Sequence, residues 1–138
     1  MSLLTQALYN ELADDETLTD LLATYNGEPA IFTTEPVPGD ASKPYIISAG
    51  AVAQEPNDTK TGQGRIVTRD IRCYAEADGS AETVEDIAER VRTLLHRQAL
   101  TVSGYTCIIT EASGPMAADE EDAYGRIVTI RVFVEKES

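Results

Sequence analysis

The chain has 138 residues, the size of one ordinary domain, and 42% of them are hydrophobic, which is enough to build a core. With 24 acidic against 11 basic residues its formal net charge is −13, which argues against binding to the phosphate backbone of a duplex. Trp is absent and aromatic residues make up only 6%, so we expect a core built mainly from Val, Ile, Leu and Ala.

The start of the chain and its cysteines predict a cytoplasmic protein. Residues 1–6 lack the basic start and long apolar core of a signal peptide, and no apolar run approaches the length of a membrane span. Cys73 and Cys107 belong to no CxxC pair or Cys/His cluster. We expect both to be reduced, buried thiols on strands.

The N-terminal segment predicts two helices. Apolar residues recur there at three- and four-residue steps: Leu4, Ala7, Leu8 and Leu12. Ser2 is the expected cap, and the acidic trio 14–16 should end this helix near Ala13, because carboxylates oppose the dipole at a helix C-terminus. Asp15 is then expected to cap a second short helix, which the turn at Asn26-Gly27 ends and which carries Leu18, Leu21 and Leu22.

The next part of the chain predicts a first hairpin. Four prolines surround the apolar patch 30–32, which is a candidate edge strand. Residues 45–52 form the first clear strand, with Gly50 as a bulge or bend. The polar, turn-rich residues 54–62 are expected to be a long hairpin loop, and residues 65–75 the second strand.

A long helix should follow at residues 81–95. Ser80 is its expected cap, and its apolar stripe comprises Val84, Ile87, Ala88, Val91, Leu94 and Leu95. Acidic residues lie near its start and arginines near its end, which suits the helix dipole, and Asp86 and Arg90 are spaced for an i,i+4 ion pair. A second hairpin completes the chain: strand 105–112, a long loop 113–125, and strand 126–135.

The pentapeptide Gly-Arg-Ile-Val-Thr occurs at 64–68 and again at 125–129, and each copy opens an alternating strand pattern. The inward set of the second copy is Val128, Ile130, Val132 and Val134. That of the first is Val67, Ile71 and Cys73, with Arg69 as the exception. Shared β-propensity is favoured over an internal duplication, because the match beyond the pentapeptide is thin.

These elements predict a single α+β domain over residues 1–138. The expected fold is a two-layer sandwich with a four-stranded, mainly antiparallel sheet made of two long hairpins. The helical crossover makes the third strand parallel to the second, so the fourth fits between them and the strand order is 1-2-4-3. The N-terminal helices and the long helix between the hairpins would pack on one face.

We find no convincing catalytic, metal or cofactor site in the sequence. His96 is the one histidine and lacks a neighbouring carboxylate or hydroxyl, so we expect a surface role for it at a helix end. The run 119–122 has consecutive acids, unlike an EF-hand, and is expected to be a solvated, mobile loop. Residues 55–60 carry acids and a lysine in a turn-rich loop, which disfavours a nuclease, and no phosphate-binding loop is present.

The charged residues of the strands and hairpin loops are the candidates for contacts with partners. The arginines of the two repeat strands could bind phosphate. Cross-strand ion pairs or subunit contacts are favoured, because acids such as Asp70 and Glu76 flank these arginines. Arg72 decorates the first repeat strand in the same way. The candidate set is Glu55, Asn57, Asp58, Lys60, Arg65, Arg69, Asp119, Glu120, Glu121, Asp122, Arg126 and Arg131.

The order of short motifs along nearly the whole chain resembles one protein family. The motifs are, in order, Leu4-x-x-x-Leu8-Tyr9-x-x-Leu12-Ala13, Leu18-x-x-Leu21-Leu22, Pro44-Tyr45-Ile46-Ile47, Arg72-Cys73-Tyr74, a Gly79-Ser80 turn before the long helix, and Gly125-Arg126. This order resembles the tail-terminator family of long-tailed phages and prophages, also called tail-completion or head-to-tail joining proteins. The family often has Trp where Tyr74 stands, so this position departs from the pattern.

The resemblance implies a structural, non-enzymatic protein without a cofactor. It would form a ring, usually a hexamer, that caps the tail tube, ends tube polymerisation and joins the head connector. DNA would pass through the lumen without specific binding, and the protein would move from the cytoplasm into the virion, at the head–tail junction. Two alternatives remain open: another neck or tube-associated virion protein, and a small ligand-binding α+β domain.

Overall fold

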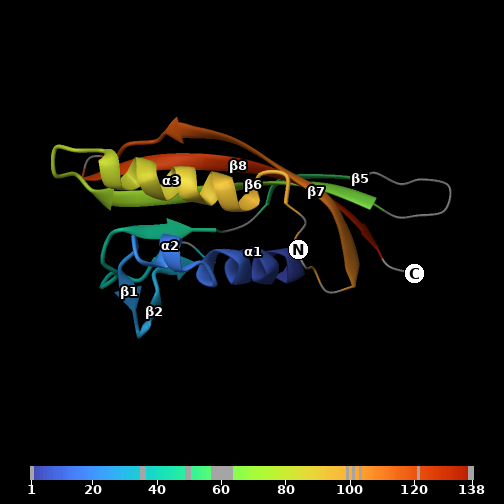
Figure 1. Ribbon diagram of the computed structural model, residues 1–138, viewed down its shortest axis with the longest axis horizontal. Helices are drawn as coiled ribbons and strands as arrows, with labels where there is room; N and C mark the ends of the chain where they lie inside the picture. The colour runs from blue at the N-terminus through green and yellow to red at the C-terminus, as the bar shows by residue number, and fades with distance from the viewer. Residues whose placement is uncertain are drawn as a thin grey trace.

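A computed structural model describes residues 2–34, 37–48, 51–56, 64–98, 100, 102, 104–120 and 122–136. Figure 1 shows long strands that extend beyond the helices packed beside them. The helices are α1 (Ser2–Ala13), α2 (Glu16–Thr19) and α3 (Glu82–Leu95). The strands are β1 (Thr24–Tyr25), β2 (Glu28–Pro29), β3 (Ile31–Phe32), β4 (Tyr45–Ile47), β5 (Ala51–Pro56), β6 (Gly64–Glu76), β7 (Tyr105–Ala117) and β8 (Ala123–Lys136).

Over the described residues, the main sheet has six strands in the order β3-β4-β6-β8-β7, with β5 also paired to β6. The predicted order 1-2-4-3 is confirmed, because β4 and β5 lie on one side of β6 while β8 lies between β6 and β7. The predicted count of four strands is wrong. The strand expected at 45–52 is divided into β4 and β5, and β3 adds a parallel edge strand that buries Ile31 beside Ile46.

The predicted loop 113–125 is also wrong, because strand pairing continues through most of it. β7 extends to Ala117 and β8 begins at Ala123. Around Gly114 and Pro115 the pairing shifts register, between Ser113 and Met116, and then resumes. β7 is an edge strand, where proline's missing N–H leaves no ladder bond unmade.

The predicted ends of the first and third helices agree closely with the structure. α1 ends at Ala13, and the Asp15 carboxylate accepts a hydrogen bond from the Leu18 N–H at 2.8 Å, so the predicted cap of α2 is confirmed. α2 is shorter than expected and ends at Thr19. Ser80 accepts from the Glu82 N–H at 3.3 Å, although Ala81 is the residue that directly precedes α3.

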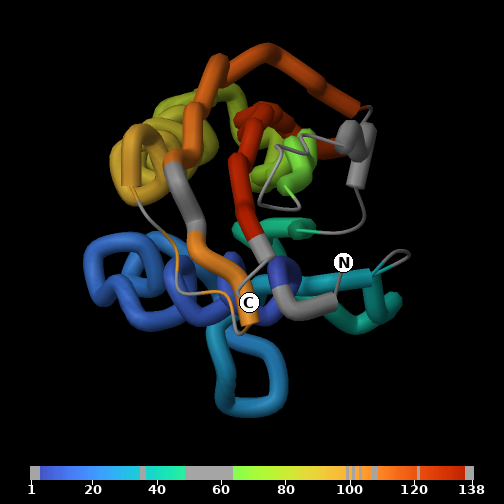
Figure 2. Tube along the Cα trace, turned by 90° about the vertical axis from the view of Figure 1, so that its right-hand side faces the viewer, coloured from blue at the N-terminus to red at the C-terminus, as the bar shows by residue number. Residues whose placement is uncertain are grey.

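The helices pack against one face of a curled sheet. Figure 2, turned from the view of Figure 1, shows α1 and α3 on the same side. The main core joins apolar side chains of α1, α2 and α3 to the predicted inward sets of β6 and β8. A smaller cluster formed by Ile47, Tyr74 and Ala123 lies apart from it. The α+β class is confirmed, whereas the four-stranded sandwich is replaced by this six-stranded curled sheet.

An ion pair ties the N-terminal helices to α3. Arg90 donates from Nε to Asp15 Oδ2 at 2.9 Å and from Nη2 to Oδ1 at 2.7 Å. The expected partner of Arg90 was Asp86, one helical turn away. Asp15 offers a bidentate geometry that a neighbour on the same helix does not, and the pair joins segments 75 residues apart. None of the helices described above has the length and hydrophobicity of a membrane span.

Candidate partner interface

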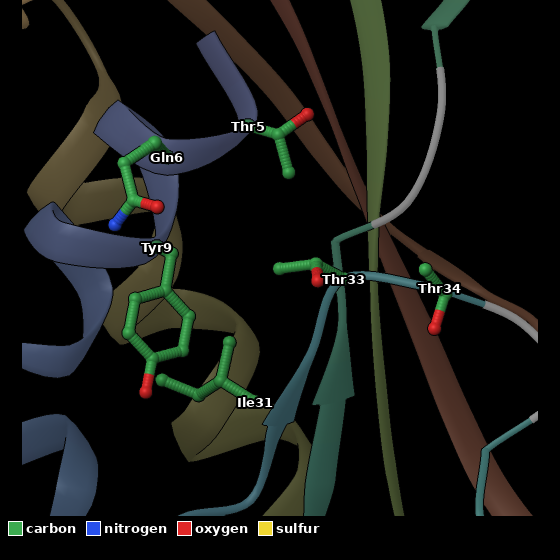
Figure 3. A pocket seen from close by; sticks show the side chains of 6 residues that line it. All are labelled: Thr5, Gln6, Tyr9, Ile31, Thr33 and Thr34. Carbon is green, nitrogen blue, oxygen red and sulfur yellow. The ribbon is translucent and has the colours of Figure 1, made fainter. Parts of the chain in front are cut away.

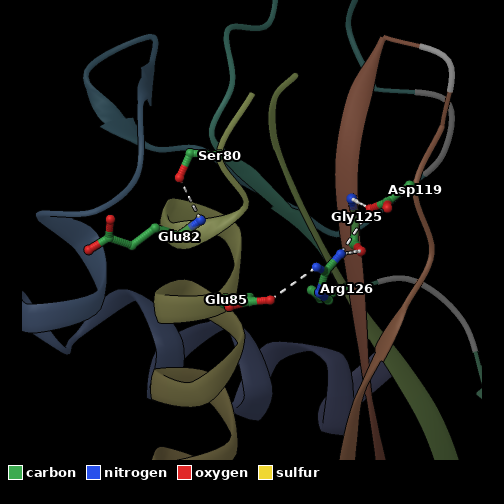
Figure 4. Close-up of polar contacts among 6 residues, drawn as sticks. All are labelled: Ser80, Glu82, Glu85, Asp119, Gly125 and Arg126. Atoms are coloured by element: carbon green, nitrogen blue, oxygen red, sulfur yellow. Dashed lines mark hydrogen bonds and ion pairs between the residues drawn. The ribbon is translucent and has the colours of Figure 1, made fainter. Parts of the chain in front are cut away.

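The hairpin turn between β7 and β8 is organised by Arg126 (Figure 4). Its Nη1 donates to Asp119 Oδ1 at 2.9 Å and its Nη2 to Glu85 Oε1 at 3.2 Å. Asp119 also accepts from the Gly125 N–H at 3.0 Å. These bonds connect the turn to the first part of α3. Asp119, expected in a solvated, mobile loop, is exposed and accepts hydrogen bonds from both Arg126 and Gly125.

The other acids of this turn differ in their surroundings. Glu120 makes a β-bridge with Ala123, and burial first, then the charge of Glu120, raises the pKa of Tyr74. Asp122 is exposed. Glu121 lies outside the described residues.

A second group of candidates belongs to the hairpin of β5 and β6. Glu55 pairs through its backbone with Ile66, and Arg65, opposite Pro56, is exposed. Asn57, Asp58 and Lys60 lie outside the described residues.

The two hairpin ends lie at opposite ends of the sheet. Because β6 and β8 pair along their full length, Gly64 lies opposite Glu135 at one end and Glu76 opposite Ala123 at the other. The 13 residues of β6 span roughly 43 Å at the usual rise per residue. Apart from Arg69 and Arg131, the candidates that the structure describes therefore form two separate groups, one at each end of the sheet.

The two remaining candidate arginines have very different surroundings. Arg131 is exposed, and its guanidinium carbon lies 5.4 Å from the ring centroid of Phe133. Arg69 is only 1% exposed, and its Nη1 donates to Thr5 Oγ1 of α1 at 2.8 Å. Arg69 thus follows the strand parity of Val67 and Ile71 and points into the core.

A pocket of about 430 Å³ lies between α1 and the end of β3. Figure 3 shows its lining side chains, which come from α1 and from β3 with the two residues after it: Thr5, Gln6, Tyr9, Ile31, Thr33 and Thr34. None of these residues was among the sequence candidates, and Glu85 was also missed. The inward position of Arg69 was the one sequence signal for a polar feature in this part of the core.

The contacts of His96 and the burial of Cys73 give these two side chains structural roles. His96 Nδ1 accepts from the buried Ala112 N–H at 3.1 Å, which joins the end of α3 to β7. Burial raises the pKa of the Cys73 thiol to about 12, so this thiol stays protonated at neutral pH. Over the described ranges, no three His, Cys, Asp or Glu side chains gather as metal ligands.

Comparisons with solved structures find the same fold in a virion. One chain of the structure described as the virion of the native gene transfer agent (GTA) particle superposes with a TM-score of 0.81 at 25% identity, covering 96% of this chain and 94% of that one. A second solved structure, at 9% identity, has a TM-score of 0.66 over 99% of this chain and 96% of its own, and shows the fold alone.

Sequence comparisons point to the same group. The comparison with curated protein sequences found no match. The family model described as tail completion protein gp17 matches residues 6–135, almost the whole chain. The chain therefore belongs to the tail completion protein gp17 family and is a structural protein of the phage tail.

Proposed function

We propose that this protein forms a ring, a hexamer by its resemblance to tail terminators, that caps the tail tube, ends tube polymerisation and joins the tail to the head connector. The protein assembles in the cytoplasm and then becomes part of the virion at the head–tail junction. It acts through binding and catalyses no reaction.

The position of the two hairpin ends carries this proposal. A protein that joins two partners along one axis needs contact surfaces that face in opposite directions. The β5–β6 hairpin and the Arg126-centred β7–β8 turn lie at opposite ends of the same long strands. One end is therefore available to the tube while the other meets the connector.

The sheet edges suit contacts between neighbouring subunits. β7 forms one edge, and its own chain covers part of that edge: Arg97 N–H donates to Thr110 O at 2.6 Å, and Ala112 N–H donates to His96. In the described part of the chain, β7 pairs only with β8 from Ser113 to Ala117, whereas Tyr105 at its start also bridges to Val102. Such an edge is a template for a neighbouring copy.

The net charge suits a lumen that DNA crosses. An excess of 13 negative charges repels phosphate, so DNA would pass through the ring without specific binding.

The test is co-assembly with the tail-tube protein of the same phage. We expect negative-stain images to show rings at one end of each tube, and tube growth to stop at that end when the protein is added. A monomer in isolation agrees with the proposal, because the ring can form on the tube. Uncapped tubes that keep growing would contradict it, and binding along the tube wall would favour the alternative of a tube-associated protein.

A further inference from the structure

Arg69 carries a positive charge into the core without a carboxylate partner among the described residues. Its Nη1 donates to Thr5, but neither Nε nor Nη2 has a hydrogen-bond partner in the part of the chain that the structure describes. Buried donors that lose water without gaining a partner are costly, and more so on a charged group. Within the described residues, the arrangement is therefore incomplete.

The two unpaired atoms have the geometry that a carboxylate requires. The Nε–H and one Nη2–H of a guanidinium point in the same direction and form a fork that matches two carboxylate oxygens. Arg90 uses the same two atoms, Nε and Nη2, to hold the two oxygens of Asp15. The unpaired side of Arg69 is thus the side with which this protein binds a carboxylate elsewhere.

The pocket described above is connected to this guanidinium through Thr5. Thr5, which accepts from Arg69, lines the pocket on the α1 side. Ser48, whose buried Oγ also has no partner, donates from its N–H to Phe32 O at 2.7 Å, next to Thr33 of the opposite wall. Both residues with unpaired polar atoms, Arg69 and Ser48, are therefore joined by a hydrogen bond to a pocket wall or to the residue next to it.

We propose that this pocket receives a carboxylate, which pairs with Nε and Nη2 of Arg69, and that the carboxylate belongs to a second copy of this chain. The assignment of the carboxylate to a second copy rests on the proposed ring. With 24 acidic residues against 11 basic ones, a copy seated on the pocket presents mainly carboxylates. The wall must move to admit the group, because Arg69 is 1% exposed, and the pair is then shielded from water.

The first experiment tests the pocket with acetate as the probe. Thermal unfolding is followed in sodium acetate and in sodium chloride of equal ionic strength at pH 7. Arg69→Met removes the fork, and Thr33→Trp fills the pocket while leaving Arg69 in place. Arg65→Met is the matched control, since it makes the same charge change at an exposed position on the same strand.

We expect acetate to raise the midpoint of the wild-type and Arg65→Met proteins, by roughly 4 °C at ten times its dissociation constant. Arg69→Met and Thr33→Trp should show no acetate-specific rise. If Arg69→Met fails to fold, Thr33→Trp carries the comparison. An equal effect of acetate on all variants, no effect on the wild type, or a larger effect of phosphate than of acetate would overturn the carboxylate site.

The second experiment identifies the source of the carboxylate. Sedimentation measures self-association of the same proteins, and of Arg92→Met, with and without acetate, free and on tail tubes. Arg69→Met should associate at least about tenfold more weakly than Arg92→Met, which removes the same charge from α3 at a position outside the candidate contacts, and acetate should compete with association of the wild type. Unchanged association of Arg69→Met, with the acetate response intact, would overturn the second copy as the source and leave both the pocket and the ring standing. If the wild type does not associate even on tubes, the proposed ring is wrong, and so is the second copy as the source of the carboxylate. The acetate response then still tests the pocket.

Discussion

Asp15 performs two tasks with one carboxylate. It caps α2 by accepting from the Leu18 N–H, and it holds the Arg90 guanidinium of α3. The hydrogen bond from Arg90, more than any other contact, keeps the pKa of Asp15 below its usual value, although partial burial opposes the shift. A carboxyl with a lowered folded-state pKa stabilises the fold when ionised, so its contribution is present above its unfolded pKa and is lost as pH falls through the folded value.

Asp15→Asn should therefore reduce stability at pH 7 and flatten its acid dependence. Loss of the charged cap and the ion pair should cost about 1 kcal/mol, and the difference from wild type should shrink between roughly pH 5 and pH 2. Urea unfolding at several pH values measures both effects. Asp14→Asn is the control, since Asp14 is exposed; a pH-independent difference for Asp15→Asn would contradict the linkage.

His96 acts as a hydrogen-bond acceptor for the edge strand. Its Nδ1 satisfies the Ala112 N–H, which is buried and would otherwise lack a partner at this edge. His96→Ala should cost about 1–3 kcal/mol and speed hydrogen exchange at the Ala112 amide. Gln98→Ala, at an exposed position just beyond, should leave that amide protected. Unchanged exchange at Ala112 in the His96 variant would show that the bond contributes nothing.

At the scale of elements, the two glycines of the repeated pentapeptide occupy opposite ends of the paired strands. The structure shows why a residue with a side chain does not fit at Gly125. A Cβ at Gly125 would collide with the carbonyl oxygen of Ala118 and lie 2.9 Å from Cε1 of Tyr74. The turn between β7 and β8 closes across this position, where Ala118 N–H donates to Gly125 O at 2.9 Å. The glycine therefore permits the tight approach that holds Arg126 beside Asp119.

Gly125→Ala should destabilise the protein by about 1–3 kcal/mol, because backbone rather than a flexible side chain must move. Chemical denaturation gives this value. Gly39→Ala is the matched control: a Cβ there meets nothing within 4 Å, and we expect a change within about 0.5 kcal/mol. Equal effects of the two substitutions would show that the close approach at Gly125 is relieved without cost.

At the scale of the whole molecule, the acidic excess opposes assembly of identical copies. A net charge of −13 on each chain makes neighbouring subunits repel, and salt screens this repulsion over about 10 Å at 0.1 M. We therefore expect self-association, free or on tubes, to strengthen as sodium chloride rises from about 20 to 300 mM. Sedimentation at matched protein concentration measures this, with sucrose of equal osmolality as the control. Weaker association at high salt would indicate that attractive ion pairs between subunits outweigh the repulsion.

The sequence by itself determined the parts of this fold that depend on short-range chemistry. Periodicity located α1 and α3, the cap at Asp15, and the inward faces of β6 and β8, because side-chain spacing reports directly on which face is buried. The direction in which the helical crossover returns the chain was enough to predict the strand order. The order of short motifs was enough for the family.

Only the tertiary structure decided which distant residues meet. The pairing of Arg90 with Asp15, the contact of Arg126 with both Glu85 and Asp119, and the pocket between α1 and the end of β3 join segments whose sequences carry no mutual signal. The extension of β7 through Gly114 and Pro115 likewise depends on its place at the sheet edge, where a bulge is tolerated. Local patterns encode burial and turn preference, whereas ion pairs and pockets arise from packing between elements, which adjacent residues do not specify.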